Sequence, residues 1–368
     1  SRAESGEYQL IKLGHRAMGQ DMASVEIIDL RAELQSGNRS MLSRRLLELM
    51  ADRLEKKQQV MLFLNRRGLM GFVSCRACGH VLKCPHCDVA LHLHGGGIMK
   101  CHYCGFTTRT VKTCPSCGSK YIGSFKAGTQ RLEEIVKESF PKARVLRMDA
   151  DTTAGKNGHE EILSAFAAGE ADVLIGTQMI VKGHDFANVT LVGIIAADIS
   201  LNESDYHSGE RTFQLLTQAV GRAGRGTELG IAVIQTYQPD NYAVVTSANQ
   251  DYDEFYKQEI AYRRLLSYPP CSHILGIQVN SEKQQDAINQ ADILAALVKK
   301  CDEKIVIMGP EDAYIGKLKD VYRRVIYVKA DEYDRLVNVK DAIDAFLLEQ
   351  RQYRNTSVWF DFDPINTL

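Results

Sequence analysis

Eight of the ten cysteines in this 368-residue chain form four Cys-x-x-Cys pairs inside one short block. The pairs are Cys75/Cys78, Cys84/Cys87, Cys101/Cys104 and Cys114/Cys117. A Cys-x-x-Cys turn places two thiolates on one side of a tight knuckle, and a tetrahedral Zn²⁺ needs two such knuckles facing each other. Because the first residues contain no apolar signal core, metal binding is favoured over a disulfide framework. The block therefore predicts two closed, structural zinc sites.

The spacing of the four pairs favours a nested arrangement. Thirteen residues separate Cys87 from Cys101, which is enough for a hairpin that brings the inner pairs together, whereas five residues separate Cys78 from Cys84. We therefore expect an outer site of Cys75, Cys78, Cys114 and Cys117 and an inner site of Cys84, Cys87, Cys101 and Cys104. Sequential pairing is the alternative. The nearby histidines are either competing ligands or surface and packing residues, namely His80, His86, His92, His94 and His102.

The same block carries a local excess of positive charge, although the whole chain has a formal net charge of −1. Residues 61–126 contain nine Lys and Arg against one acid, formally +8. Eight thiolates (−8) with two Zn²⁺ (+4) would reduce this to +4. The remaining charge fits either a surface for a nucleic-acid backbone or simple compensation of the zinc–thiolate charge.

A second group of reactive side chains lies in the stretch QAVGRAGRG, residues 218–226. Arg222 and Arg225 are three apart on a predicted helix, so we expect both guanidinium groups on one face, where they could bind a phosphate. A plain helix end with solvated arginines is the alternative. The nearest imitation of a P-loop is TTAGKNG, but Asn157 stands where Ser or Thr is needed and Ala150 where Gly is needed. We therefore expect a lobe outside this sequence to hold the phosphate.

These side chains must be positioned by apolar strands that alternate with amphipathic helices over about residues 40–240. That pattern predicts a doubly wound α/β domain, a parallel sheet with helices on both faces, with the Cys-rich insertion (74–120) after its first strand. We expect strands at 59–65, 144–149, 171–177, 189–198 and 231–237. We expect helices at 40–57 with Ser40 as the cap, and at 129–140, 159–169 and 208–224.

The remaining segments predict a linker and a smaller domain. Residues 1–39 are expected to be an interlobe segment, and 241–270 a connecting helix that Pro269 and Pro270 stop. Residues 271–368 have the order strand, helix, strand, strand, helix, strand, which predicts a compact α+β domain. No apolar run is long enough to predict a transmembrane helix.

Three stretches, FLNRRG (63–68), GTQMIVKGHDF (176–186) and QAVGRAGR (218–225), resemble motifs IV, V and VI of superfamily 2 helicases. The resemblance implies the RecA-like second lobe of such a motor. By resemblance, Arg222 and Arg225 are arginine fingers for the γ-phosphate of ATP. Nucleotide contacts would come from Gly183, Asp185 and Gln218. Contacts to DNA would come from Arg66, Arg67, Thr177, Gln178 and Lys182.

The Cys-rich insertion directly after FLNRRG narrows the resemblance. Together with GTQRLEE, DADTTAGK, ERTFQLLTQ, YPPCSH, IGKLKDVYRRVIYVK and DFDPINTL, it resembles the PriA family of replication-restart helicases over essentially the whole chain. Two departures are Gln130, where the family tends to have an acid, and Asp205-Tyr206-His207, where it tends to have Asp-Phe-Arg. The role of His207 therefore stays open.

The family resemblance implies a DNA-stimulated ATPase that unwinds 3′ to 5′ at stalled forks in the bacterial cytoplasm, at the nucleoid. Implied partners are forked and single-stranded DNA, single-stranded-DNA-binding protein, and primosome and helicase-loader proteins. Implied cofactors are two Zn²⁺ and ATP with Mg²⁺. In the C-terminal domain, Lys317, Tyr322 and Arg323 could contact DNA, with the tyrosine stacking on a base, or could form a solvated strand edge.

We interpret the chain as the C-terminal portion of a longer protein and expect it to be inactive as an ATPase by itself. One alternative is a non-enzymatic zinc-ribbon DNA-binding protein with a relic RecA-like scaffold. A repair helicase of another superfamily 2 branch is a further alternative, which the Cys-rich insertion disfavours.

Overall fold

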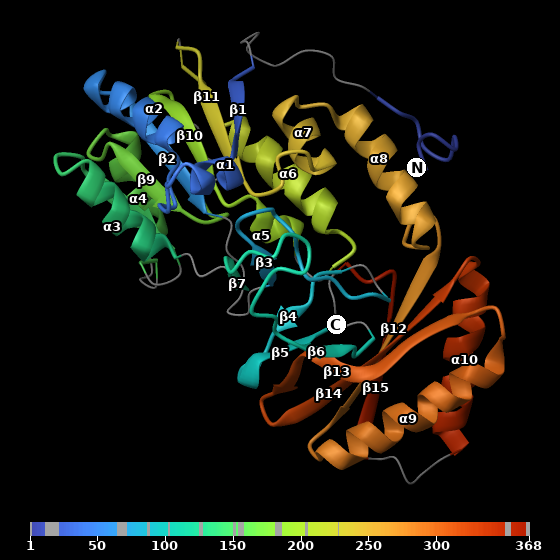
Figure 1. Cartoon of the computed structure of the whole chain (residues 1–368). Coiled ribbons are helices and arrows are strands. Elements are labelled where there is room, and N and C mark those ends of the chain that lie inside the picture. Colours follow the sequence, from blue (N-terminus) through green and yellow to red (C-terminus); the bar gives the residue numbers. More distant parts are fainter. Residues whose placement is uncertain are drawn as a thin grey trace. The chain divides into compact units, whose positions relative to one another are not determined.

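The structure is a computed structural model (Figure 1). It describes residues 2–11, 22–64, 72–86, 89–101, 104–124, 128–149, 152–153, 158–180, 186–202, 205–226, 228–349 and 355–365. The chain divides into two compact units. The first unit comprises residues 1–81, 111–202 and 208–256, and the second comprises 82–110, 203–207 and 257–368. Among the helices that can be described, none is both long and apolar enough to cross a membrane.

The first unit is built on a six-stranded parallel sheet with the order β1-β11-β10-β2-β9-β8. Its strands are β1 (Ser24–Asp29), β2 (Gln59–Leu64), β8 (Val145–Met148), β9 (Val173–Gly176), β10 (Val189–Ile195) and β11 (Ile231–Thr236). Every residue of β2, β9 and β10 is buried. Strands buried on both faces need no alternation of polar and apolar residues, and they require helices on both sides of the sheet.

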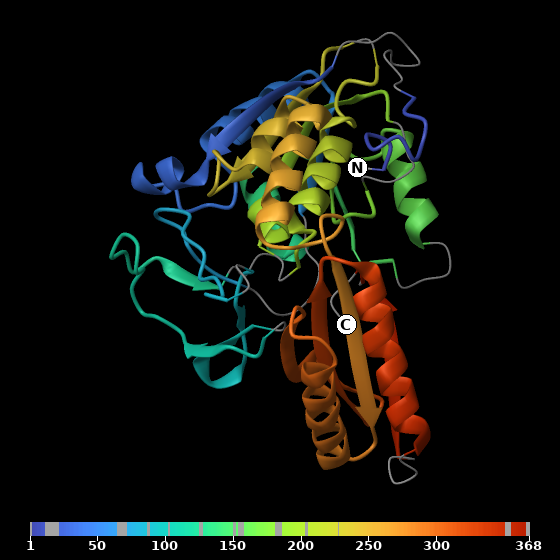
Figure 2. The same ribbon diagram turned by 90° about the vertical axis from the view of Figure 1, so that its right-hand side faces the viewer.

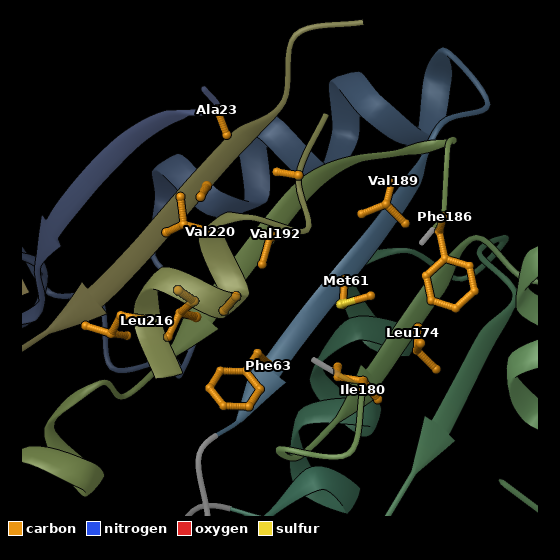
Figure 3. Close-up of a cluster of buried hydrophobic side chains, with 14 of the residues drawn as sticks. Ala23, Met61, Phe63, Leu174, Ile180, Phe186, Val189, Val192, Leu216 and Val220 are labelled. Atoms are coloured by element: carbon orange, nitrogen blue, oxygen red, sulfur yellow. The ribbon is translucent and has the colours of Figure 1, made fainter. Parts of the chain in front are cut away.

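Those helices cover the two faces as the sequence predicts. Helices α2 (Arg44–Glu55) and α3 (Thr129–Ser139) pack with Leu62 and Leu64 of β2 on one face. On the other face, Met61 and Phe63 join a cluster with α4 (Gly158–Ala167), α6 (Ser208–Val220) and α7 (Tyr242–Ala248). Figure 3 shows Phe63 and Met61 in this cluster with Leu216 and Val220 of α6. The predicted doubly wound architecture is confirmed.

The second unit contains a four-stranded antiparallel sheet with the order β13-β14-β12-β15. Its elements are β12 (His273–Ser281), α9 (Gln284–Cys301), β13 (Val306–Leu318), β14 (Val321–Ala330), α10 (Tyr333–Glu349) and β15 (Thr356–Phe362). Alternate residues of the strands pack with α9 and α10 in one apolar core (Figure 2). The element order equals the predicted one.

The Cys-rich block forms two small sheets. Strands β3 (Val73–Cys75) and β7 (Ile122–Ser124) pair in the first unit. Strands β4 (His92–Leu93), β5 (Ile98–Lys100) and β6 (Thr107–Arg109), with the short 3₁₀ helix η1 (Gly95–Gly97), form a meander in the second unit. The described residues also form helices α1 (Leu30–Gln35), α5 (Asp198–Leu201) and α8 (Tyr252–Leu265).

Two details of the sequence predictions were wrong. Residues 24–29 are the edge strand β1, paired with β11, although 1–39 was expected to be a linker. Helix α2 begins at Arg44, and its cap is Ser43, whose hydroxyl accepts a hydrogen bond from the Leu46 N–H. The hydroxyl of Ser40 instead accepts from the Leu42 N–H, within the turn that precedes the helix.

A cysteine-rich metal centre and an arginine turn

The structure groups the outer cysteines as nested pairing predicts. The sulfur atoms of Cys75, Cys78, Cys114 and Cys117 all lie within 4.8 Å of one another. Cys75 Sγ is 3.7 Å from Cys117 Sγ, and Cys78 Sγ is 3.7 Å from Cys114 Sγ. Four sulfurs at about 2.3 Å from a tetrahedral Zn²⁺ would be separated by roughly 3.8 Å. The donor set and spacing therefore fit zinc.

The inner cysteines form a second cluster. The sulfurs of Cys84, Cys101 and Cys104 lie within 4.8 Å of one another, and Cys84 Sγ is 3.5 Å from Cys104 Sγ. Cys87, the expected fourth ligand, lies outside the described residues. His92 lies between Cys84 and Cys101 in the sequence, and its side chain is buried. Burial lowers the pKa of its imidazole to about 4. A neutral, buried ring fits the packing role that the sequence allowed for the histidines.

Three of the knuckles share one backbone geometry. In each, the first cysteine N–H donates to the carbonyl five residues on, and a glycine four residues on donates back to the cysteine carbonyl. These glycines, Gly79, Gly105 and Gly118, have positive φ angles. The geometry turns N–H groups toward sulfur. In Cys114, burial opposes ionisation, but the N–H groups of Cys117 and Ser116 together with the neighbouring thiols lower the pKa of the thiol to about 7, whereas burial raises the pKa of Cys75 and Cys78. Thiolates are the form that binds zinc.

The outer knuckle is anchored to the carboxyl edge of the parallel sheet, after β11. Arg76 Nε donates to the hydroxyl of Tyr237 over 2.8 Å, and a Cβ on Gly79 would overlap the Tyr237 carbonyl. The Tyr237 N–H in turn donates to Asp198, whose carboxylate also accepts from the Thr236 hydroxyl at 2.9 Å. Burial raises the pKa of Asp198 to about 6. The buried carboxylate thus fixes the strand end on which the zinc knuckle rests.

The sequence reasoning passed over Asp198 and Tyr237 as members of the site. Tyr237 directly follows β11, and Asp198 comes three residues after the last residue of β10. A carboxylate at the end of an apolar strand is the signal that could have identified Asp198. The contact between Tyr237 and Arg76 joins residues 161 apart, and no local pattern indicates it.

Arg222 and Arg225 do not lie on a helix face, so this part of the prediction was wrong. Helix α6 ends at Val220, and the two arginines occupy the tight turn that follows. Gly224 has φ +70°, and its N–H donates to the carbonyl of Val189 over 3.0 Å. A Cβ at Gly224 would overlap the backbone of Gly230. The glycines, rather than helical periodicity, therefore set the position of the two arginines.

The Arg222–Arg225 turn and the Thr177–Gln178 pair lie at opposite ends of the parallel strands, the turn at the amino ends and the pair at the carboxyl ends. Thr177 follows the carboxyl end of β9, whereas the arginine turn packs on Val189, the first residue of the parallel strand β10. Gln218 is exposed on the last turn of α6, next to the arginine turn. Besides Cys87, five predicted site residues lie outside the described residues, namely Arg66, Arg67, Lys182, Gly183 and Asp185.

The predicted DNA-binding residues of the C-terminal domain lie around the turn between β13 and β14. Lys319 and Asp320 at the turn both have positive φ angles. The Lys317 ammonium lies 5.0 Å from the centroid of the Tyr322 ring, and Arg323 donates to the Gln278 side chain at 2.7 Å. The structure therefore places these residues at a hairpin end, with Tyr322 beside a cation.

Arg76 and Lys100, two basic residues of the Cys-rich block, have protein partners. Arg76 bonds Tyr237, and Lys100 forms ion pairs with Glu311 and Asp312 at 2.6 and 3.4 Å. These two side chains therefore bind other parts of the protein, in addition to any contact with nucleic acid or compensation of zinc charge.

Family models match residues 120–227 as a helicase conserved C-terminal domain, 84–109 as the PriA DNA helicase Cys-rich region, and 264–365 as the primosomal protein N C-terminal domain. Fold and motifs together define the second lobe of a helicase that carries a zinc-binding Cys-rich insertion. The full-chain matches are more specific.

The chain belongs to the PriA family of replication restart proteins. It is 43% identical to replication restart protein PriA of Bacillus subtilis over 366 residues, 99% of this chain and 46% of that protein. The Synechocystis protein is 40% identical over 359 residues, 96% of this chain and 42% of the relative. The Thermotoga maritima protein is 34% identical over 315 residues, which are 85% of this chain and 42% of that relative. The chain thus spans a little under half the length of these relatives.

Proposed function

We propose that this chain is the arginine-finger half of an ATP-dependent 3′-to-5′ DNA helicase of replication restart. In this proposal, a P-loop lobe outside the present sequence holds most of ATP and Mg²⁺. Arg222 and Arg225 stabilise the charge that develops on the transferring phosphoryl group, and Gly183, Asp185 and Gln218 contact the nucleotide. An arginine finger contributes roughly 10³–10⁵ in rate, which is about 4–7 kcal/mol of barrier.

The observation that carries the proposal is the glycine-fixed turn of the two arginines. A Cβ on Gly226 would overlap the Ala187 carbonyl, and Gly224 bonds Val189. The turn is therefore bound to the chain segment that directly follows Asp185, the proposed ribose contact. A solvated helix end would need neither close approach. Placing two guanidinium groups beside the nucleotide segment is what a phosphoryl-transfer site requires.

We propose DNA contacts at two places, one in each unit. In the first unit, the backbone of a DNA strand would be contacted by Thr177 and Gln178, which lie at the carboxyl ends of the β-strands. Arg66, Arg67 and Lys182 would contact the same DNA backbone. In the second unit, Lys317, Tyr322 and Arg323 would meet a phosphate and a base. The Lys317–Tyr322 contact supports this second place, because a cation and a ring on one hairpin end can bind a phosphate and stack on its base.

We propose two Zn²⁺ as structural cofactors, held by the outer and inner cysteine clusters, with Cys87 completing the inner one. A bound Zn²⁺ would cross-link the strands of this small block and supply folding energy that so little apolar core cannot. The further partners implied for the intact protein are single-stranded-DNA-binding protein and primosome and helicase-loader proteins.

The test compares the intact protein with the 368-residue chain. DNA-stimulated ATP turnover and unwinding of substrates with a 3′ or a 5′ tail would be measured for both. We expect the intact protein to hydrolyse ATP and to prefer the 3′-tailed substrate, and the chain to bind DNA without turnover. Turnover by the chain alone would contradict the division into halves. DNA binding without turnover by the intact protein would instead indicate the zinc-ribbon DNA-binding protein.

A further inference from the structure

The inner cysteine cluster has a close contact with strand β13 of the same unit. Lys100 Nζ lies 2.6 Å from Glu311 Oε1 and 3.4 Å from Asp312 Oδ2. Only 18% of the Lys100 side chain and 20% of the Glu311 side chain are exposed. A charged pair this far removed from water is held more firmly than a surface ion pair and is less screened by salt.

The contact involves the zinc knuckle itself. Lys100 directly precedes Cys101, and Gly105 directly follows Cys104. A Cβ on Gly105 would overlap the Glu311 carboxylate. Glu311 therefore lies against the backbone of the knuckle, and its carboxylate forms an ion pair with Lys100, which precedes the knuckle. Glycine is required at 105 for the turn, where φ is +76°, and also for this close approach.

The two carboxylates on β13 are held in place from the other side by Arg324. Its Nη1 is 2.8 Å from Asp312 Oδ1 and 3.7 Å from Glu311 Oε1, and its Nη2 donates to the Pro310 carbonyl. Two cations thus neutralise two carboxylates, so the half-buried cluster carries no net charge. Arg324 belongs to β14 and Lys100 to the cysteine block, so the cluster joins the two.

A second contact lies along the same strand. The rings of His92 and Tyr314 meet edge to face, with centroids 5.7 Å apart and planes at 88°. The outer cluster has different neighbours, since its knuckle rests on Tyr237 of the first unit. Each metal cluster is therefore tied to the core of a different unit.

We infer that the two zinc sites have separate duties, and that Glu311 is a positioning residue that latches the inner zinc knuckle to the C-terminal domain. The inference rests on the proposed occupancy of both clusters by zinc. Metal at the inner site keeps the Cys101–Gly105 knuckle in the shape that receives Glu311. The latch then orders β13, while metal at the outer site orders only the attachment to the first unit.

The experiment follows hydrogen exchange of the β13 and β14 amides in the full chain. Cys101→Ser, which opens the inner cluster, should raise their exchange about tenfold or more. Cys114→Ser, which opens the outer cluster, should leave them unchanged. Equal effects of both variants would overturn the inference.

A second measurement tests Glu311 directly through the rate of zinc release to a chromogenic chelator. Glu311→Gln should speed the release of one of two zinc ions about tenfold, because the ion pair is lost while the shape is kept. The charge swap Lys100→Glu with Glu311→Lys should restore slow release, at least in part. Glu332→Gln, at an ion pair whose carboxylate side chain is 70% exposed, is the matched control and should change neither zinc ion.

Release of both zinc ions at the wild-type rate from Glu311→Gln would overturn the latch. Faster release of both ions together would also overturn it, because the two duties would not be separate. A zinc content below two per chain in the wild type would instead remove the proposed occupancy, so the two failures can be told apart.

Discussion

The ring of Tyr206 stacks on the ring of Tyr268, with centroids 4.8 Å apart and planes only 6° from parallel. The Tyr206 hydroxyl donates to the carbonyl of Pro364 over 3.3 Å, and the Arg263 guanidinium lies 5.5 Å from the ring centroid. Residues around 206, 268 and 364, which are far apart in the sequence, therefore meet inside the second unit. The Tyr206 hydroxyl has an acceptor there.

Tyr206 should matter mainly as a stacking surface. Tyr206→Phe loses one hydrogen bond and should cost about 1 kcal/mol. Tyr206→Ala empties a site that is 4% exposed and should cost about 3–5 kcal/mol. Unfolding can be followed by fluorescence of Trp359, the only tryptophan, which lies in this unit. Tyr252→Ala, at a tyrosine that is 61% exposed, is the control and should have a small effect. Equal losses from Tyr206→Ala and Tyr252→Ala would refute the stacking role.

Gly224→Ala should displace the arginine turn. The new Cβ would overlap the Gly230 backbone in addition to the strain of positive φ. We expect the intact protein to lose at least tenfold in DNA-stimulated ATP turnover while retaining zinc and DNA binding. Gly169→Ala is a matched control, because Gly169 has φ +75° and nothing within 4 Å of the added Cβ. A similar loss in both variants would indicate backbone strain alone.

The buried carboxyl of Asp198 should make the first unit less stable as pH rises. Burial raises its pKa from 3.8 to about 6, so the folded state holds the proton more tightly than the unfolded state. The wild type should therefore lose stability relative to Asp198→Asn as pH rises from about 4 to 6, by about 3 kcal/mol in all for two pKa units, and should show little further change above pH 6. Thermal unfolding of both proteins from about pH 3.5 to 7 measures the difference. A wild type that becomes more stable relative to Asp198→Asn over this range would contradict the prediction.

Zinc should protect eight of the ten cysteines. The two cysteines outside the Cys-rich block, Cys271 and Cys301, are accessible in part, and Cys301 is exposed. A thiol reagent should titrate Cys301 quickly and Cys271 more slowly, with eight more thiols after chelation. Metal analysis should give two zinc ions per chain. Eight thiols that stay inaccessible after chelation and become accessible only after reduction would point to disulfides.

Much of the fold is predictable because burial leaves a local trace. Strands β2 and β10 are apolar runs, and helices α3 and α9 have amphipathic patterns that match their observed bounds closely. Strand β1 was missed because it is an edge strand of mixed polarity, SVEIID, none of whose residues is fully buried. Its assignment depends on pairing Ser24 with Ile231, which no local pattern encodes.

The site was predictable in its residue types and less so in its geometry. Spacing alone favoured the nested grouping of cysteines that the sulfur distances now show. The predicted helix over 208–224 is too long at its C-terminal end. Helix α6 ends at Val220 because of Gly221 and Gly224, although the amphipathic pattern continues. The contact of Lys100 with Glu311 spans 211 residues, so only the folded structure reveals it.

The central claim is that Arg222 and Arg225 act on ATP held by another lobe. It is tested most directly by ATP turnover and DNA binding of the intact protein carrying Arg225→Ala. Arg131→Ala, at an exposed arginine on α3 paired with Glu134, serves as the control. We predict that Arg225→Ala lowers turnover by roughly 10³-fold or more with DNA affinity nearly unchanged, and that Arg131→Ala changes neither. Turnover of Arg225→Ala within a few-fold of the wild type would contradict the account.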